Sequence, residues 1–138
     1  MIPRGAVHHI DLSVSDLAAA RAFYEPVLGF MGYGVGEDYG ARGVDFDHVE
    51  PGRFWSIGIR ISEGPNAGRA HDRYAPGLHH LAWAAASRED VDALHALLLR
   101  IGARVLDAPA DYPQYGAGYY AVFFADPDGL KLEYVFKP

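Results

Sequence analysis

The chain has 138 residues, enough for one compact domain or for two small modules that share a core. Half of the residues are hydrophobic and 22% are charged, which is typical of a folded globular protein and excludes a disordered one. The formal net charge of -6 and the lack of a basic cluster disfavour binding to a phosphate backbone, so we expect no nucleic-acid partner.

The absence of cysteine removes disulfides, thiolate metal sites and cysteine nucleophiles from consideration. Any metal would therefore need His, Asp or Glu ligands. No apolar stretch approaches membrane-spanning length, and the N-terminal residues 1–5 contain no apolar signal region. We therefore expect no membrane association and a cytoplasmic location.

The first half of the chain predicts a strand, a helix, a weak strand and a hairpin. Residues 7–14 alternate apolar and polar side chains, and Ser15-Asp16 offers N-cap chemistry for a helix that ends at Gly29. The glycine-rich stretch after it supports only a short strand at 33–35. The hairpin is predicted from strands at 44–49 and 54–61.

The second half repeats this order after a linker at 63–77, which has no periodicity. Residues 78–85 predict a strand, and Ser87-x-x-Asp90 begins a helix that Gly102 closes. A short strand at 104–106 and a loop at 107–117 follow. The last hairpin spans 118–136, with its turn at Asp126-Pro127-Asp128-Gly129.

The matching order of elements indicates a tandem duplication, with a first module at 1–62 and a second at 78–138. Each module has the pattern βαβββ, so the fold class is α+β. One helix cannot cover the strand surface of a module, and we expect the two modules to pair in one compact domain. The prediction is a curved mixed sheet around a cup, with the helices outside.

The duplication selects three residues as metal ligands. His9 and His80 occupy the same position of their first strands, on the face opposite the apolar residues, and Glu133 points away from the apolar face of the last strand. Two imidazoles and one carboxylate with room for solvent suit a divalent cation such as zinc, nickel, iron or manganese. His8 and His79 are lower-ranked alternates, because a shift of one residue changes the face of the strand.

Several stretches resemble the vicinal oxygen chelate superfamily, which includes glyoxalase I, the bleomycin- and fosfomycin-resistance proteins and the extradiol dioxygenases. They are HHIDLSVSDLAAARAFYEPVLGF at 8–30, GLHHLAWAA at 77–85 and FFADPDGLKLEYV at 123–135. The resemblance implies two βαβββ modules that enclose a cup, in which His9, His80 and Glu133 match three of four metal positions. It also implies a homodimer and a small-molecule substrate.

The resemblance implies a fourth metal position on the strand at 54–61, occupied by Glu or Gln, but the candidate positions in this chain hold Ser56, Gly58 and Arg60. This departure disfavours the glyoxalase I reaction itself. Three ligands with open positions resemble the metal site of the extradiol dioxygenases. However, this chain lacks the additional histidine of those enzymes and has Phe123 in place of their tyrosine.

Two kinds of function remain open. The first is a metal-dependent enzyme that chelates two neighbouring oxygens of a small substrate, most simply a glyoxalase-like lyase or isomerase, with ring cleavage as a variant. The second is a binding protein without chemistry that sequesters a ligand, as in the bleomycin-resistance branch. Retention of all three predicted ligands favours the enzyme.

Further site residues are predicted from strand and loop positions. Asp45 and Asp47 alternate with apolar residues. They could point into the cup and supply a general base or a fourth metal ligand, or they could lie on a solvated edge strand. One of Tyr119 and Tyr120 must face the cup. The predicted catalytic residues are Glu133, Tyr120 and Asp47, and the predicted substrate contacts are Tyr115, Tyr119 and Arg60.

Overall fold

The computed structural model describes residues 3–138 and contains two compact units, Met1–Arg69 and Ala70–Pro138. The boundary between the units falls inside the segment at 63–77 that the sequence predicts as a linker. Each unit has its own hydrophobic core and its own sheet, so each is described by itself.

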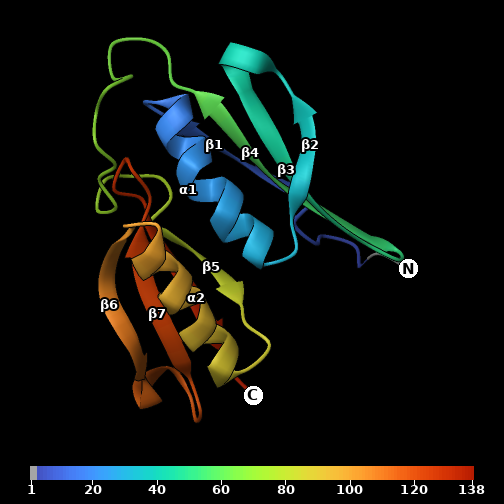
Figure 1. Ribbon diagram of the computed structural model, residues 1–138, viewed down its shortest axis with the longest axis vertical. Coiled ribbons are helices and arrows are strands. Elements are labelled where there is room, and N and C mark those ends of the chain that lie inside the picture. The colour runs from blue at the N-terminus through green and yellow to red at the C-terminus, as the bar shows by residue number, and fades with distance from the viewer. Residues whose placement is uncertain (1–2) are drawn as a thin grey trace. The chain divides into compact units, whose positions relative to one another are not determined.

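The first unit is a four-stranded mixed sheet with one long helix (Figure 1). The strands lie in the order β1-β4-β3-β2, with β1 parallel to β4 and the other pairs antiparallel. In chain order the elements are β1 (His9–Val14), α1 (Leu17–Phe30), β2 (Gly34–Asp38), a 3₁₀ turn (Gly40–Arg42), β3 (Gly43–Glu50) and β4 (Arg53–Ile61).

The second unit has the same topology, in the strand order β5-β8-β7-β6 with β5 parallel to β8. Its elements are β5 (His80–Ala84), α2 (Arg88–Arg100), β6 (Arg104–Asp111), a 3₁₀ turn (Pro113–Tyr115), β7 (Tyr120–Ala125) and β8 (Lys131–Phe136). The structure thus confirms the α+β class and the two tandem βαβββ modules.

Local sequence explains where both helices begin. The Asp16 carboxylate accepts a hydrogen bond from the Ala19 N–H at 3.0 Å and caps α1. The Ser87 hydroxyl oxygen does the same for the Asp90 N–H at 3.0 Å and caps α2. Each cap satisfies one of the backbone donors that the first helical turn leaves without a partner.

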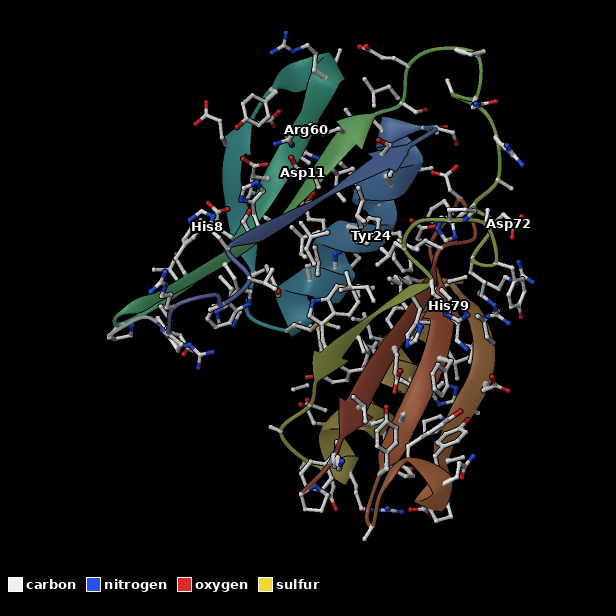
Figure 2. All side chains as sticks on the ribbon, turned by 180° about the vertical axis from the view of Figure 1, so that it is seen from behind. His8, Asp11, Tyr24, Arg60, Asp72 and His79 are labelled. Carbon is white, nitrogen blue, oxygen red and sulfur yellow. The ribbon has the colours of Figure 1, made fainter. Side chains whose placement is uncertain are left out.

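Each sheet buries one face against its helix. Tyr24 of α1, labelled in Figure 2, is fully buried, and so is Leu98 of α2 in the second unit. Strand residues at alternate positions complete the two cores, among them Leu12, Val14, Val44, Phe46, Ile57, Ile59, Val122, Phe124, Leu132 and Tyr134. In the described residues neither helix is long and apolar enough to cross a bilayer.

The predicted loop at 107–117 is wrong over its first part, because β6 continues to Asp111. This strand lies at the edge of its sheet. Pro109 is tolerated there because an edge strand does not need every backbone N–H for pairing, and proline has none. Its pairing with β7 shifts register between Val105 and Asp107 and again between Asp107 and Ala110. The irregular pairing explains why the segment shows no clear alternation in the sequence.

Candidate functional site

Strand β8 divides its side chains between the two faces of the second sheet. Tyr134 points toward α2, since its hydroxyl donates to the Asp90 carboxylate at 2.7 Å. Glu133 is the next residue back and therefore lies on the face away from the helix. This is the orientation that alternation in the sequence predicts for Glu133.

Glu133 is almost completely buried, with 3% of its surface exposed, and it has two polar partners. His80 on β5 places its Nε2 3.4 Å from Glu133 Oε1. The Tyr119 hydroxyl donates a short hydrogen bond to Oε2. Burial, together with this hydrogen bond, raises the pKa of Tyr119, so its hydroxyl stays protonated at neutral pH and remains a donor.

The His80 and Glu133 pair fits two corners of a metal site. Nitrogen and oxygen ligands that each lie about 2.0 to 2.2 Å from one ion stand about 3.0 to 3.5 Å apart, which includes the observed separation. The same geometry also suits an ion pair between a protonated imidazole and the carboxylate. The donor set of imidazole and carboxylate is the one that zinc, iron, manganese and nickel accept in proteins.

Aromatic side chains surround this pair. The rings of Tyr112, Tyr115 and Tyr119 contact one another, with the Tyr115 and Tyr119 centroids 5.4 Å apart. Phe123 faces Glu133 across the β7–β8 ladder and carries the Lys131 ammonium 4.6 Å above its ring. Tyr115 and Tyr119, the two predicted substrate contacts from this unit, thus contact each other, and Tyr119 in turn contacts Glu133.

Tyr120 lies on the opposite face of the sheet from Glu133. Its hydroxyl donates to the Asp92 carboxylate of α2 at 2.6 Å, and the Arg88 guanidinium stacks 3.9 Å from its ring centroid. Alternation along β7 therefore does not bring Tyr120, which the sequence predicts as catalytic, to the acid. Of the two adjacent tyrosines it is Tyr119 that reaches Glu133.

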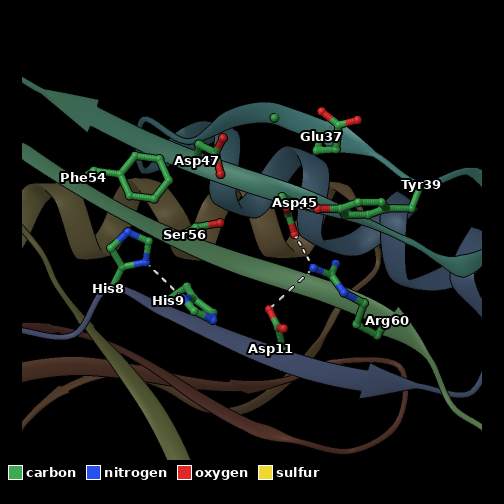
Figure 3. A pocket seen from close by; sticks show the side chains of 11 residues that line it. His8, His9, Asp11, Glu37, Tyr39, Asp45, Asp47, Phe54, Ser56 and Arg60 are labelled. Atoms are coloured by element: carbon green, nitrogen blue, oxygen red, sulfur yellow. Dashed lines mark hydrogen bonds and ion pairs between the residues drawn. The ribbon is translucent and has the colours of Figure 1, made fainter.

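The first unit has a pocket of about 530 Å³ on the sheet face away from α1 (Figure 3). Its floor contains His9, Ser56 and Asp47, which are direct neighbours on β1, β4 and β3. Same-level residues on adjacent strands share a face, so their side chains form a row across the sheet. Both His9 and Asp47 were predicted site residues, whereas Ser56 was not.

A second group of pocket residues is a charged cluster around Arg60. The guanidinium donates to Asp45 at 2.7 Å and lies 3.8 Å from Asp11, and Figure 3 shows the three residues together. The Tyr39 hydroxyl also donates to Asp45, at 3.0 Å. Arg60, a predicted substrate contact, is therefore already held by two carboxylates.

The strand register identifies the internal counterpart of Glu133. His80 pairs with Lys131 and Glu133 lies two residues later, whereas His9 pairs with Ser56 and Gly58 lies two residues later. A side chain on Gly58 would meet Asp11 Oδ1 2.1 Å from its Cβ. Strand β4 thus has Gly58 where β8 has Glu133, and the Asp11 carboxylate occupies the space beside this glycine.

A contact between adjacent histidines occurs in both units. The Nδ1 atoms of His8 and His9 are 3.0 Å apart, and those of His79 and His80 are 2.8 Å apart. His8 also lines the pocket beside His9, contrary to the expectation that it points to the other face. The reason is that β1 begins at His9, so alternation does not extend to His8.

The three predicted ligands belong to different units, His9 to the first and the other two to the second. Within residues 3–138, no group of three or more His, Asp or Glu side chains converges in a metal-binding arrangement. The second unit by itself brings together two of the predicted ligands. That His9 joins them remains a prediction.

The chain belongs to the glyoxalase/bleomycin resistance protein/dioxygenase superfamily, whose family model matches residues 6–134. Its curated relatives include the uncharacterized protein YqjT of Bacillus subtilis, which is 36% identical over 129 residues, 94% of this chain and 97% of that protein. An ethylmalonyl-CoA/methylmalonyl-CoA epimerase of Cereibacter sphaeroides is 32% identical over 125 residues, 89% of each chain.

Solved structures show the same fold. A glyoxylase/bleomycin resistance protein/dioxygenase domain from Frankia sp. EAN1pec superposes with a TM-score of 0.76 at 26% identity, over 99% of this chain and 100% of that one. A lactoylglutathione lyase from Agrobacterium tumefaciens superposes with a TM-score of 0.68 at 22% identity, over 98% and 96% of the two chains. The resemblance noted in the sequence is thereby confirmed.

Proposed function

We propose that this chain is a divalent-metal-dependent enzyme that moves a proton beside an oxygen-bearing carbon of a small organic substrate, as a glyoxalase-like lyase or isomerase. The observation that carries the proposal is the buried Glu133 with His80 3.4 Å away on the polar face of the second sheet. We assign His9, His80 and Glu133 as the metal ligands. The metal would supply Lewis acidity for two neighbouring substrate oxygens.

The protein residues would hold the site and move the proton. Tyr119 keeps Glu133 in place through its hydrogen bond, and the contact with His79 turns the His80 ring so that Nε2 faces the carboxylate. Asp47 is the better candidate base of the two acids on β3, because Asp45 is held by Arg60 and Tyr39. A carboxylate without such partners is free to accept a proton.

The comparisons support this class of reaction without fixing the substrate. An epimerase, like a glyoxalase-type isomerase, removes and returns a proton next to a carbonyl, and a relative with that name is 32% identical to this chain. Ring cleavage is less well supported, since the chain lacks the additional histidine of the extradiol dioxygenases and has Phe123 in place of their tyrosine. A homodimer in the cytoplasm is part of the proposal and rests on the resemblance to the family.

Proton exchange measured with and without metal tests the proposal. We would incubate the chain with dihydroxyacetone in deuterated buffer, after loading with zinc, nickel, manganese or iron, and follow exchange of the carbon-bound protons by NMR. At least one metal should accelerate exchange over both the metal-free protein and the free ion. Glu133→Gln and His80→Ala should lower the rate at least about tenfold, because even changes to residues that only orient metal ligands cost about 10- to 100-fold.

His95→Ala provides the matched control, because His95 lies on α2 and outside the site. Its exchange rate should equal that of the original chain. If the metal-free protein exchanges protons as fast as the loaded protein, metal dependence is refuted. If no metal produces exchange of this substrate or of a methylmalonyl thioester, the ligand-sequestering alternative replaces the enzyme.

A further inference from the structure

The pocket of the first unit contains the hydroxyl group of a largely buried serine, Ser56. Ser56 has only 7% of its surface exposed, and its side chain takes part in no hydrogen bond within residues 3–138. Its oxygen lies in the pocket between His9 and Asp47 (Figure 3). The oxygen is open to the pocket and has both donor and acceptor capacity, so a ligand in the pocket would complete its hydrogen bonds.

Asp47, the neighbour of Ser56 on β3, likewise has no hydrogen-bond or ion-pair partner in the described part of the chain. Its carboxylate lies across Gly36 of β2, where a Cβ would stand 2.1 Å from Oδ2. Only a residue without a side chain leaves room for the carboxylate there. Ser56 and Asp47 together offer an ionised acceptor beside a hydroxyl, a combination that a ligand with donor groups would satisfy.

The remaining charges of the pocket disfavour an anionic ligand. Asp11, Glu37, Asp45 and Asp47 contribute four carboxylates, and Arg60 contributes the one guanidinium among the lining residues that the structure describes. The donors of that guanidinium are directed to Asp45 at 2.7 Å and to the Ile59 carbonyl at 3.2 Å. Its charge is therefore matched internally, and the field in the pocket is negative.

We propose that this pocket binds a small, uncharged or cationic molecule with several hydroxyl or ammonium groups. These groups would donate hydrogen bonds to the Ser56 hydroxyl and the Asp47 carboxylate. A volume of about 530 Å³ is in the range of small-molecule pockets. The pocket also contains His9 and Asp47, the proposed metal ligand and base, so the inference rests on the proposed function and adds the chemical class of its ligand, while binding itself requires no metal. It distinguishes this chain from its epimerase relative, whose named thioester acids are anions.

Three hexoses of nearly equal size test the assignment. Glucosamine is cationic, glucose is neutral and glucuronate is anionic, so the series separates charge from shape. We would measure the three dissociation constants by NMR titration of the isotope-labelled full chain, with resonances of the first unit as the reporter. Glucosamine should bind most tightly, glucose less tightly and glucuronate most weakly, with about a tenfold span that shrinks at high salt.

Two variants locate the binding in the pocket. Asp47→Asn should abolish the preference for glucosamine over glucose, because it removes the charge and keeps the shape. Ser56→Ala should weaken glucosamine and glucose alike by about three- to tenfold, the loss of one hydrogen bond. Ser13→Ala is the control, since Ser13 is exposed on β1 and does not line the pocket.

The proposal is overturned if glucuronate binds as tightly as glucosamine, or if none of the three sugars shows saturable binding. It is also overturned if both pocket variants bind glucosamine as the original chain does. Because the titration is made on the metal-free chain, a failure of His9, His80 and Glu133 to hold a metal leaves the test unaffected. Sugar binding without metal-dependent proton exchange would refute the proposed reaction and keep the pocket assignment, so the two failures are distinguishable.

Discussion

Replacing Tyr119 by phenylalanine removes one hydroxyl and tests whether the buried Glu133 depends on that donor. Glu133 is 3% exposed, and the Tyr119 hydroxyl is one of its two polar partners. The variant leaves Oε2 without its donor in a site that water reaches poorly. Such a loss costs about 1 to 3 kcal/mol, and partial exposure of Tyr119 places the expected value at about 1 to 2 kcal/mol.

Urea unfolding followed by tryptophan fluorescence measures the effect in the unit concerned. Trp55 lies in the first unit and Trp83 in the second, so a Trp55→Phe background leaves Trp83 as the reporter. For a unit of this size the dependence on urea is about 1 kcal/mol per molar, so the midpoint should fall by about 1 to 2 M. The slope of the transition should not change.

Tyr115→Phe is the matched control, because 57% of Tyr115 is exposed and the structure records ring contacts for it but no hydroxyl hydrogen bond. A double-mutant cycle with Glu133→Gln should return a coupling energy of about 1 kcal/mol. Equal midpoints for the two tyrosine variants, or a coupling energy near zero, would show that the hydrogen bond does not support the acid.

Two further predictions concern the stability of the two units. Leu98→Ala should destabilise the second unit by about 2 to 5 kcal/mol because Leu98 is fully buried, while Leu99→Ala, at a 61% exposed position, should have little effect; similar losses in urea unfolding would contradict the packing described. In the first unit Gly43 has φ +153°, and a Cβ would stand 2.1 Å from the Ile59 carbonyl oxygen, so Gly43→Ala should cost about 1 to 3 kcal/mol. Gly34→Ala on β2 introduces a Cβ with no atom within 4 Å and needs no positive φ, so it should cost less, and equal thermal midpoints for the two variants would refute this.

The sequence predicts most of the fold because its signals are local. The caps at Asp16 and Ser87 begin their helices where the sequence indicates, and the final turn forms at Asp126, whose carboxylate accepts from the N–H groups of Asp128 and Leu130. The repeat then orders the elements into two modules. The second half of β6 was missed because edge pairing with register shifts erases the alternation that reveals a strand.

The candidate site is predictable only where one strand determines it. Alternation correctly places Glu133 away from the helix, and it gives Asp47 the pocket face. The role of Ser56 depends on its neighbours on β1 and β3, and the face of Tyr120 depends on where β7 begins. The sequence pattern of a single strand contains neither kind of information. The parallel pairing of β1 with β4, which places Ser56 beside His9, is what brings Ser56 into the pocket.

Metal binding to the purified, metal-free chain is the most direct test of the central claim that His9, His80 and Glu133 hold one ion. Calorimetric titration with zinc should give one ion per chain, with an affinity that His9→Ala and His80→Ala each lower by about 100-fold, while His95→Ala leaves it unchanged. Zinc binding by His9→Ala with the original affinity would contradict the claim, and binding of no ion by the original chain would remove the metal from the account.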